Sequence, residues 1–316
     1  PLVVYCSRQA HSSIEKAALL AGFGRAHVRA VAVDESFRLD AAALEAAIAA
    51  DRRAGLRPCA VVATTGTTAT TAMDPIAAVA SIAAREGLWL HVDAAMGGAA
   101  MILPEYREHW LGIEAADSIV VNPHKWLTVA FDCSLYLVRD PEHLVRVMST
   151  NPSYLQTAVD REVRNYRDWG IPLGRRFRAL KIWFALRTQG VEAIRARLRE
   201  HVLLARALAE RLAARPDWRV LAPVTLQTVC LRHEPPGLGA EALDAHTRRW
   251  AQAVNDSGEA YLTPALIDGA WGVRVSIGSE YTNASAVEQL EALMIRESAR
   301  SAAQGTTDGR QEGSTC

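Results

Sequence analysis

The sequence predicts an α/β protein, with a large domain built on a mainly parallel sheet and a smaller α+β domain after it. Up to about residue 140, short apolar runs alternate with helical patterns. These runs are continuous rather than alternating, as in strands that are covered on both faces. The chain has 316 residues, 50% hydrophobic and 22% charged, which is enough for one large core and a second smaller one.

The predicted elements of the large domain follow one another in a strand–helix rhythm. The strands are expected at Leu2–Cys6, Val28–Val33, Cys59–Ala63, Leu88–Val92, Ser118–Val121 and Ser134–Val138. Helices are expected between them at Ser12–Ala21, Asp40–Ala54 and Asp74–Arg85. In the last of these, Asp74 is the expected N-cap and Pro75 the first helical residue. The rhythm predicts a parallel sheet with helices on both faces.

The rest of the chain departs from this rhythm. Residues 149–174 are polar and too long for an ordinary connection, which indicates a functional loop within a large domain of residues 1–180. A long Arg- and Ala-rich helix is expected over about 176–214. The strand-like segments "WRVLA", "TLQTVCLR", "AYLT" and "WGVRVSI", with helices near 240–255 and 284–297, predict a small domain over residues 181–297. Residues 298–316 lack periodicity and are expected to be a disordered tail.

Charge and cysteine content limit the classes of function that we expect for this protein. Lys+Arg and Asp+Glu are 35 each, so nothing favours a nucleic-acid partner, and no apolar stretch is long enough for a membrane span. Five cysteines without CxxC or zinc spacing read as reduced thiols of a cytoplasmic protein. The chain begins at Pro1, directly on a strand-like run, so we expect the N-terminal part of a longer protein to precede it.

Lysine is rare in this chain, which draws attention to each one. Lys occurs only at 16, 125 and 181, against 32 Arg. Arg does not deprotonate in proteins, whereas a desolvated Lys can become an amine nucleophile. Lys16 and Lys181 lie in helical patterns and are interpreted as solvated side chains. Lys125 differs, because "NPHKW" follows a buried strand at the edge where open α/β sheets bind ligands.

Asp93 ends another buried strand, "LWLHVDAA", at the same predicted edge. A buried carboxylate needs a positive partner, and one interpretation is that Asp93 and Lys125 neutralise each other. The other is a cofactor between them, with an aldehyde for the lysine and a protonated ring nitrogen for the aspartate, as in pyridoxal phosphate. At about 4 Å and an effective dielectric near 20, that second attraction is roughly 4 kcal/mol. A His91–Asp93 metal pair has no third ligand at convincing spacing, so no metal is predicted.

Taken in order, these motifs resemble one family. "YCSRQAHSSIEKA", "VVATTGTTATTAMDP", "HVDAA", "NPHKW", "FDCS", "NPSYL" and "YRDWGIPLGRRFRALKIWF" are similar to the group II pyridoxal-phosphate-dependent decarboxylases, in the aromatic-L-amino-acid (DOPA-type) branch. The resemblance implies an aspartate-aminotransferase-like (fold type I) large domain. It also implies a homodimer with active sites at the subunit interface. The family's N-terminal dimerisation segment, its Ser/Ala-rich phosphate loop and most of its aromatic pocket match nothing in this chain.

The resemblance also implies cofactor-binding roles for single residues. Lys125 is then the Schiff-base lysine, and Asp93 pairs with the pyridine nitrogen. His11 stacks on one face of the ring and Ala95 lies under the other, although His11 alone reads as a helix-capping residue. Further residues are assigned to the same site. Asn122 and His124 help to hold the phosphate, and Thr68 lies near the cofactor, although its segment also reads as a simple Thr-rich turn.

Two further residues bear on the reaction type that the resemblance implies. Tyr154 matches a loop tyrosine that returns a proton to the substrate's α-carbon, a step worth about 10²- to 10⁴-fold; its alternative is an interface aromatic. Family members with Phe there tend to oxidise the amine to an aldehyde. Gly174 matches a substrate position where Gly tends to accompany catechol or indole substrates.

The predicted reaction is α-decarboxylation of an aromatic L-amino acid, such as DOPA, tryptophan, tyrosine or phenylalanine, to its amine and carbon dioxide. A glutamate- or diaminobutyrate-type decarboxylase and an aldehyde synthase are alternatives of the same class. A non-catalytic fragment that only oligomerises is the alternative of another class. Assays with several amino acids, with carbon dioxide and peroxide both measured, distinguish these possibilities.

Overall fold

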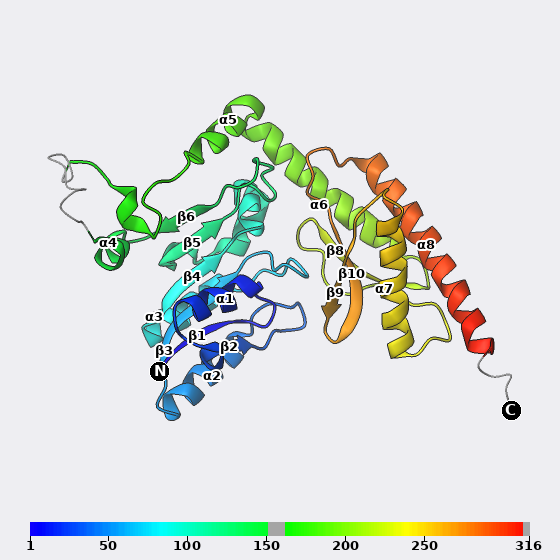
Figure 1. Ribbon diagram of the computed structural model, residues 1–316, viewed down its shortest axis with the longest axis horizontal. Coiled ribbons are helices and arrows are strands. Elements are labelled where there is room, and N and C mark those ends of the chain that lie inside the picture. Colours follow the sequence, from blue (N-terminus) through cyan, green and yellow to red (C-terminus); the bar gives the residue numbers. More distant parts are fainter. Residues whose placement is uncertain (151–161, 312–316) are drawn as a thin grey trace.

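The computed structural model describes residues 1–150 and 162–311, with side chains described as far as residue 303. Two lobes lie side by side, and the long helix α6 runs from one to the other (Figure 1). The first lobe contains a six-stranded sheet of order β2-β1-β3-β4-β5-β6, in which only the β5–β6 pair is antiparallel. The second contains an antiparallel sheet of order β7-β8-β10-β9.

The six strands of the large sheet confirm the predicted apolar runs. They are β1 (Leu2–Ser7), β2 (Val28–Val31), β3 (Arg57–Thr64), β4 (Trp89–Asp93), β5 (Ser118–Val121) and β6 (Leu135–Val138). The helices of this lobe are α1 (Ser12–Leu20), α2 (Ala41–Arg53), α3 (Ile76–Glu86) and α4 (Glu142–Met148). Asp40 is the N-cap of α2, since its carboxylate accepts from the amides of Ala42 and Ala43. Helices α2 and α3 both pack against β3.

The predicted capping of α3 by Asp74 is wrong. Pro75 occupies the N-cap position, and the buried Asp74 carboxylate instead accepts from two backbone amides, those of Leu39 and Thr64, at 2.7 Å each. Burial raises the Asp74 pKa to about 7. Asp74 therefore joins the end of β3 to the loop after β2, a long-range role that local capping rules do not reveal.

The predicted single helix over 176–214 is two helices. α5 (Ala179–Gln189) ends at Gly190, whose φ of 78° lies outside the helical region, and α6 (Val191–Ala213) begins directly after it. Gly adopts positive φ without the steric cost that a side chain imposes. The break allows α6 to leave the direction of α5 and cross between the lobes (Figure 1).

The second lobe has two further helices behind its sheet. Its strands are β7 (Trp218–Val220), β8 (Thr228–His233), β9 (Thr263–Ile267) and β10 (Ala270–Ser276), and its helices are α7 (Ala240–Asp256) and α8 (Ala284–Gln311). β9 begins at the last residue of the predicted "AYLT" strand. α8 continues past residue 298, with Ser298 and Ser301 buried, so the prediction of a disordered tail from 298 is wrong for this stretch. The small serine side chains pack closely here, in a stretch of the sequence that has no large apolar residues.

Helix α6 belongs to both hydrophobic cores. Ile194, Leu198 and Val202 are buried with the large sheet, whereas Ala205 and Leu208, farther along the same helix, are buried with the small sheet. At 1.5 Å per residue such a helix is long enough to reach across two cores. None of the helices in the described part of the chain is long and apolar enough to cross a membrane.

Candidate active site

A cavity of about 610 Å³ opens at the carboxyl ends of β3, β4 and β5. Parallel strands bring their carboxyl ends to one edge of a sheet, which is where α/β proteins bind ligands. The cavity is lined by these predicted site residues: His11, Thr68, Asp93, Ala95, Asn122 and Lys125. The sheet therefore gathers side chains that span more than a third of the sequence.

Lys125 is held by its backbone, and its ammonium group has no partner among residues 1–150 and 162–303. It closes a turn after β5, in which the Lys125 amide donates to the Asn122 carbonyl at 2.9 Å. The side chain is half-buried on the cavity wall. Its Nζ has no hydrogen-bond or ion-pair partner among the described residues. A cation on a cavity wall that forms no ion pair is available to a ligand.

Asp93 ends β4 and faces the same cavity. Its register places it beside Thr64 of β3 and Val120 of β5. The residue is buried, and Oδ1 accepts from the Ala95 amide at 3.1 Å, while Oδ2 has no partner within the described part of the chain. Asp93 and Lys125 form no ion pair with each other. Mutual neutralisation, the simpler of the two interpretations of this pair, is therefore not what the structure contains.

His91 lies two residues before Asp93 and points to the same face of β4. Its Nδ1 is 2.8 Å from Ser118 Oγ, which also accepts from Trp89 Nε1 at 2.9 Å. Burial lowers the His91 pKa, against the opposing effect of the Asp93 charge. Among the residues that the structure describes, no three His, Cys, Asp or Glu side chains are grouped to hold a metal. His91 is therefore a neutral wall residue tied to β5.

His11 and Thr68 line the cavity from two loops. His11 Nδ1 caps α1 by accepting from the Ser13 amide at 3.2 Å, so the capping interpretation is correct and the ring also reaches the cavity. The Thr68 loop leaves β3 through Gly66, whose φ is +81°. A Cβ on Gly97 would lie 2.5 Å from the Thr65 carbonyl oxygen, so this loop packs on the segment after Asp93 only because the residue there is glycine.

Two side chains of α6 hold the chain that follows Lys125. Trp126 is 1% exposed and its indole Nε1 donates to His201 Nδ1 at 3.1 Å. Thr128 Oγ1 accepts from Arg197 at 2.9 Å. Because α6 also belongs to the small-domain core, the lysine turn is anchored at the junction of the two lobes.

Three predicted site residues are not placed on the cavity wall. His124 points instead toward the loop before β6, with Nδ1 at 2.5 Å from the Cys133 carbonyl oxygen. Gly174 is exposed and away from the lining residues. Tyr154 falls outside the described residues. These roles stay predictions.

The lining also contains residues that the sequence did not single out. Ser134 and Tyr136 approach from β6 and its start, two residues apart and so on one face of the strand. Ser134 Oγ donates to Asn122 Oδ1 at 2.6 Å, and the Tyr136 ring lies 6.5 Å from that of His91. In the sequence, the alternation of polar Ser134 and Tyr136 with Leu135 and Leu137 is the pattern from which these two lining residues could have been predicted.

These groups fit a ligand with two opposite ends. The free Lys125 amine matches an electrophilic carbonyl carbon, and the free Asp93 oxygen matches a protonated nitrogen. Because the two side chains do not pair, the space between them is available to a flat ring that carries both functions. The pyridine ring and aldehyde of pyridoxal phosphate have this chemistry.

The chain is similar to known proteins in both sequence and fold. The family described as the pyridoxal-dependent decarboxylase conserved domain matches residues 1–234. The aromatic-L-amino-acid decarboxylase of Drosophila simulans is 40% identical over 287 residues, 91% of this chain and 54% of that protein. The phenylacetaldehyde synthase of Arabidopsis thaliana is 37% identical over 292 residues, 91% of this chain and 60% of that protein.

A solved structure agrees with these matches. The crystal structure of Oryza sativa TDC with PLP and tryptamine superposes with a TM-score of 0.91 and 36% identity, covering 95% of this chain and 63% of that one. The chain thus spans about half the length of the fly protein that it matches. The fold expected for the large domain is confirmed by this superposition.

Proposed function

Because this chain belongs to the pyridoxal-dependent decarboxylase family, we propose that it binds pyridoxal 5′-phosphate and takes part in the α-decarboxylation of an aromatic L-amino acid. The products are the corresponding amine and carbon dioxide. The observation that carries the proposal is that the Lys125 ammonium and one oxygen of the Asp93 carboxylate line the same cavity without a partner among the described residues. The similarity to the Drosophila aromatic-L-amino-acid decarboxylase supports the substrate class.

Each cavity residue has a role in this proposal. When bound, pyridoxal phosphate supplies an aldehyde for an amine and a protonated pyridine ring that withdraws electrons. Lys125, with its amine deprotonated, would bond to the aldehyde carbon with loss of water, and Asp93 Oδ2 would accept a hydrogen bond from the protonated ring nitrogen. His11 and Ala95 enclose the ring from its two faces. Asn122 and Thr68 lie on the wall where polar contacts to the phosphate are needed, and His124 has only Nε2 left for such a contact.

The protons of the reaction also need residues of this chain. Loss of carbon dioxide leaves an electron pair at the α-carbon, and a proton must be added there to give the amine. Tyr154 is proposed as its donor, and Lys125 Nζ would hold the cofactor once the amine product has left. Positioned acids of this kind contribute about 10²- to 10⁴-fold.

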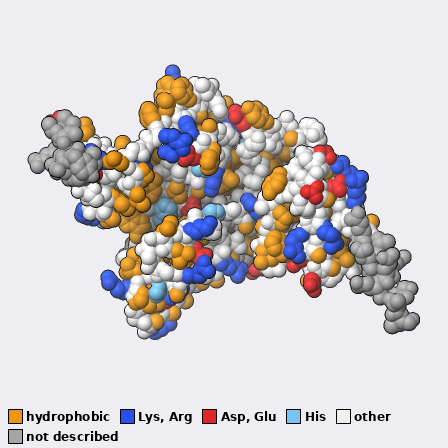
Figure 2. All heavy atoms as spheres, viewed as in Figure 1, with side chains coloured by type: hydrophobic (Ala, Val, Ile, Leu, Met, Phe, Trp, Pro, Cys, Tyr) orange, Lys and Arg blue, Asp and Glu red, His pale blue; other side chains and the backbone are white. Residues whose placement is uncertain are grey.

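We also propose a homodimer, with the active site near the subunit interface. Large apolar side chains are exposed along residues 163–191: Val163, Tyr166, Ile171, Leu173, Phe177, Leu180, Trp183, Phe184, Leu186 and Val191. Figure 2 shows hydrophobic side chains gathered over α5 and beside β6 and α4. Apolar patches of this extent mark protein–protein contacts. The buried free thiols of Cys6, Cys133 and Cys230 agree with a cytoplasmic location, which we propose as well.

A substrate panel tests the proposal. The protein, supplied with pyridoxal phosphate, is assayed with DOPA, tryptophan, tyrosine and glutamate, and carbon dioxide, amine and hydrogen peroxide are measured. We expect carbon dioxide and amine from an aromatic substrate, without peroxide and without activity in Lys125→Ala. Peroxide in step with carbon dioxide would indicate the aldehyde synthase, and turnover of glutamate alone the acidic-substrate class. No product from any substrate would leave the non-catalytic alternative.

A further inference from the structure

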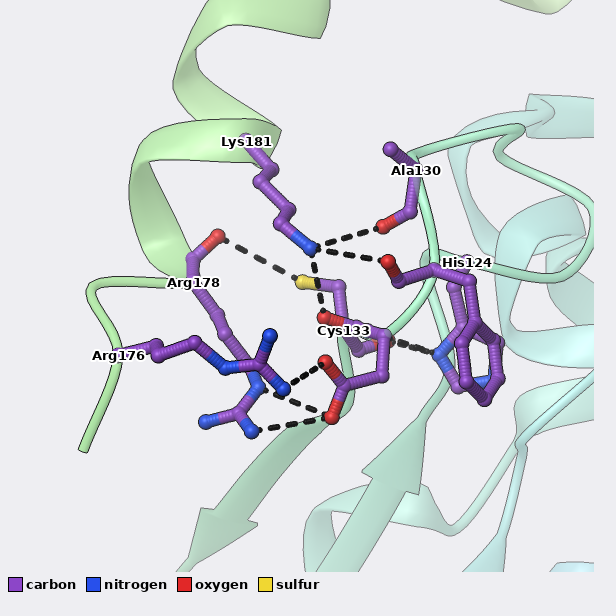
Figure 3. Close-up of polar contacts among 8 residues, drawn as sticks. His124, Ala130, Cys133, Arg176, Arg178 and Lys181 are labelled. Carbon is purple, nitrogen blue, oxygen red and sulfur yellow. Dashed lines mark hydrogen bonds and ion pairs between the residues drawn. The ribbon is translucent and has the colours of Figure 1, made fainter.

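Three consecutive carbonyl groups of the loop before β6 converge on one ammonium group. Lys181, in the first turns of α5, donates from Nζ to the carbonyl oxygens of Ala130, Phe131 and Asp132, at 3.2, 3.2 and 3.1 Å (Figure 3). An ammonium has three N–H donors, so all of them are used. Lys181 is half-buried, and its ammonium bonds to the protein instead of lying free in water as we predicted.

The same loop is held by charge at Asp132. Arg178 donates to Asp132 Oδ2 from two nitrogens, at 3.1 and 3.0 Å, and Arg176 donates to Oδ1 at 3.1 Å. The Arg178 hydrogen bond lowers the pKa of the Asp132 carboxyl. Cys133 adds a weak contact from Sγ to the Arg178 carbonyl oxygen at 3.7 Å. Side chains and backbone at the start of α5, and just before it, therefore bond to four successive residues of this loop, 130–133.

The loop in turn holds the lysine turn on the other side. His124 Nδ1 bonds to the Cys133 carbonyl, the Val129 amide donates to the Pro123 carbonyl at 3.1 Å, and Ser134 bonds Asn122. Together these contacts involve Asn122, Pro123 and His124, the three residues of the turn that precede Lys125. Figure 3 shows His124 and Lys181 on opposite sides of the loop segment that carries Cys133.

Lysine suits this position because the acceptors surround one point. Arg presents its donors in a planar fork, which matches carboxylates and does not match three carbonyls around a single atom. Charge-assisted hydrogen bonds are the strong ones. Since Lys125 Nζ has no partner in the part of the chain that the structure describes, the turn that carries it depends on contacts made by its neighbours, such as these.

We propose that Lys181, with the Asp132–Arg178 pair beside it, is a positioning residue that fixes the loop 130–133 and through it the turn bearing Lys125. This inference rests on the proposed function in so far as Lys125 binds the cofactor. Lys181 itself does not line the cavity. It acts through the backbone, from outside the site.

Two measurements on matched lysine variants test this role. Lys181→Met keeps a long side chain and removes the ammonium, while Lys16→Met removes an exposed lysine of α1 that has no partner in the described part of the chain. Backbone hydrogen exchange over residues 122–134 is measured without cofactor. The concentration of pyridoxal phosphate that half-saturates the lysine-bound absorption band is measured separately.

In Lys181→Met we expect exchange at 122–125 to be about tenfold faster and the half-saturating concentration about tenfold higher, equal to about 1.4 kcal/mol. Lys16→Met should match the wild type in both. Unchanged exchange at 122–125, or an unchanged half-saturating concentration despite faster exchange, would overturn the proposal. Asp132→Asn should show the same changes in smaller degree, and it decides the matter where Lys181→Met does not fold.

Failure of the proposed function looks different. In that case the wild type itself shows no lysine-bound cofactor band. The exchange measurement needs no cofactor, so it still shows whether Lys181 orders the turn.

Discussion

Two clusters of polar side chains in this molecule follow opposite rules. In the cavity of the large domain, Lys125 Nζ and one oxygen of Asp93 have no partner within the described residues. In the small domain, His233 and His246 form a chain in which each ring nitrogen is paired. His233 bonds Asp217 at 3.0 Å and His246 at 2.8 Å, and His246 bonds Ser301 at 3.1 Å.

The difference separates side chains kept for a ligand from side chains that hold the fold. One arrangement of protons satisfies the whole chain: Ser301 donates to His246, His246 donates to His233, and His233 donates to Asp217. Buried polar groups that are fully paired stabilise a unique packing, whereas a charged group on a cavity wall without a partner can bind a ligand. We therefore expect substitutions in the two clusters to have separate effects, on cofactor binding in one and on stability in the other.

Lys125→Ala should have the largest effect on function. Without the amine no covalent bond to the aldehyde forms, so the activity supplied by the amine nucleophile falls to background, a loss of at least about 10³-fold. The unfolding free energy should change by less than about 0.5 kcal/mol, because the ammonium has no partner to lose. Activity assays and denaturant unfolding of the same preparation measure the two effects. A strong loss of stability would remove the contrast between the clusters.

Asp93→Asn should weaken the ring-nitrogen interaction while keeping the bond from the Ala95 amide. The charge attraction at stake is roughly 4 kcal/mol at an effective dielectric near 20, so activity should fall by up to about 10³-fold. Steady-state kinetics at saturating cofactor measure this change. An Asn variant as active as the wild type would show that Asp93 does not serve the ring nitrogen.

His246→Leu should have the largest effect on stability. It leaves His233 Nδ1 and Ser301 Oγ without the partners that they have in the wild type, which costs about 2–4 kcal/mol. Ser301→Ala removes only the end of the chain and should cost about 1 kcal/mol. Denaturant unfolding gives both values, and cofactor affinity should stay at the wild-type level in each. A fall in affinity without a fall in stability would contradict the division that we draw.

Acidification should weaken the small domain to a lesser extent. Burial lowers the His233 pKa, and it lowers that of His246 to about 4, with the nearby His233 and Arg249 charges acting in the same direction. These histidines take up protons in the unfolded chain as the pH falls through about 6.5, whereas folded His246 does not until about 4 and folded His233 does so only below its ordinary pKa. Stability is therefore complete above about pH 7 and is lost by about 1–3 kcal/mol as the pH falls toward 4. Unfolding curves at several pH values test this, and His246→Leu should flatten the dependence.

The sequence predicted those parts of the fold that local patterns determine. The six apolar runs became the strands of the large sheet, and the strand-end residues Asp93 and Lys125 met because parallel strands end at one edge. Asp74 and Lys181 were misread, since each bonds to backbone groups distant in sequence. No local sequence pattern predicts the His233–His246 hydrogen bonds, because His233, His246 and Ser301 lie on three separate elements, β8, α7 and α8. Such contacts depend on the packing of whole elements.

The scarcity of lysine allows one direct test of the central claim, that Lys125 binds an aldehyde cofactor. The wild-type protein is incubated with pyridoxal phosphate and reduced with borohydride, which makes a lysine–aldehyde bond permanent, and the three lysine-containing peptides are analysed by mass spectrometry. We predict the cofactor mass on Lys125 alone, with Lys16 exposed and unlabelled and Lys181 protected by its three carbonyls. Label on Lys16 or Lys181 in place of Lys125, or on none of the three, would contradict the account.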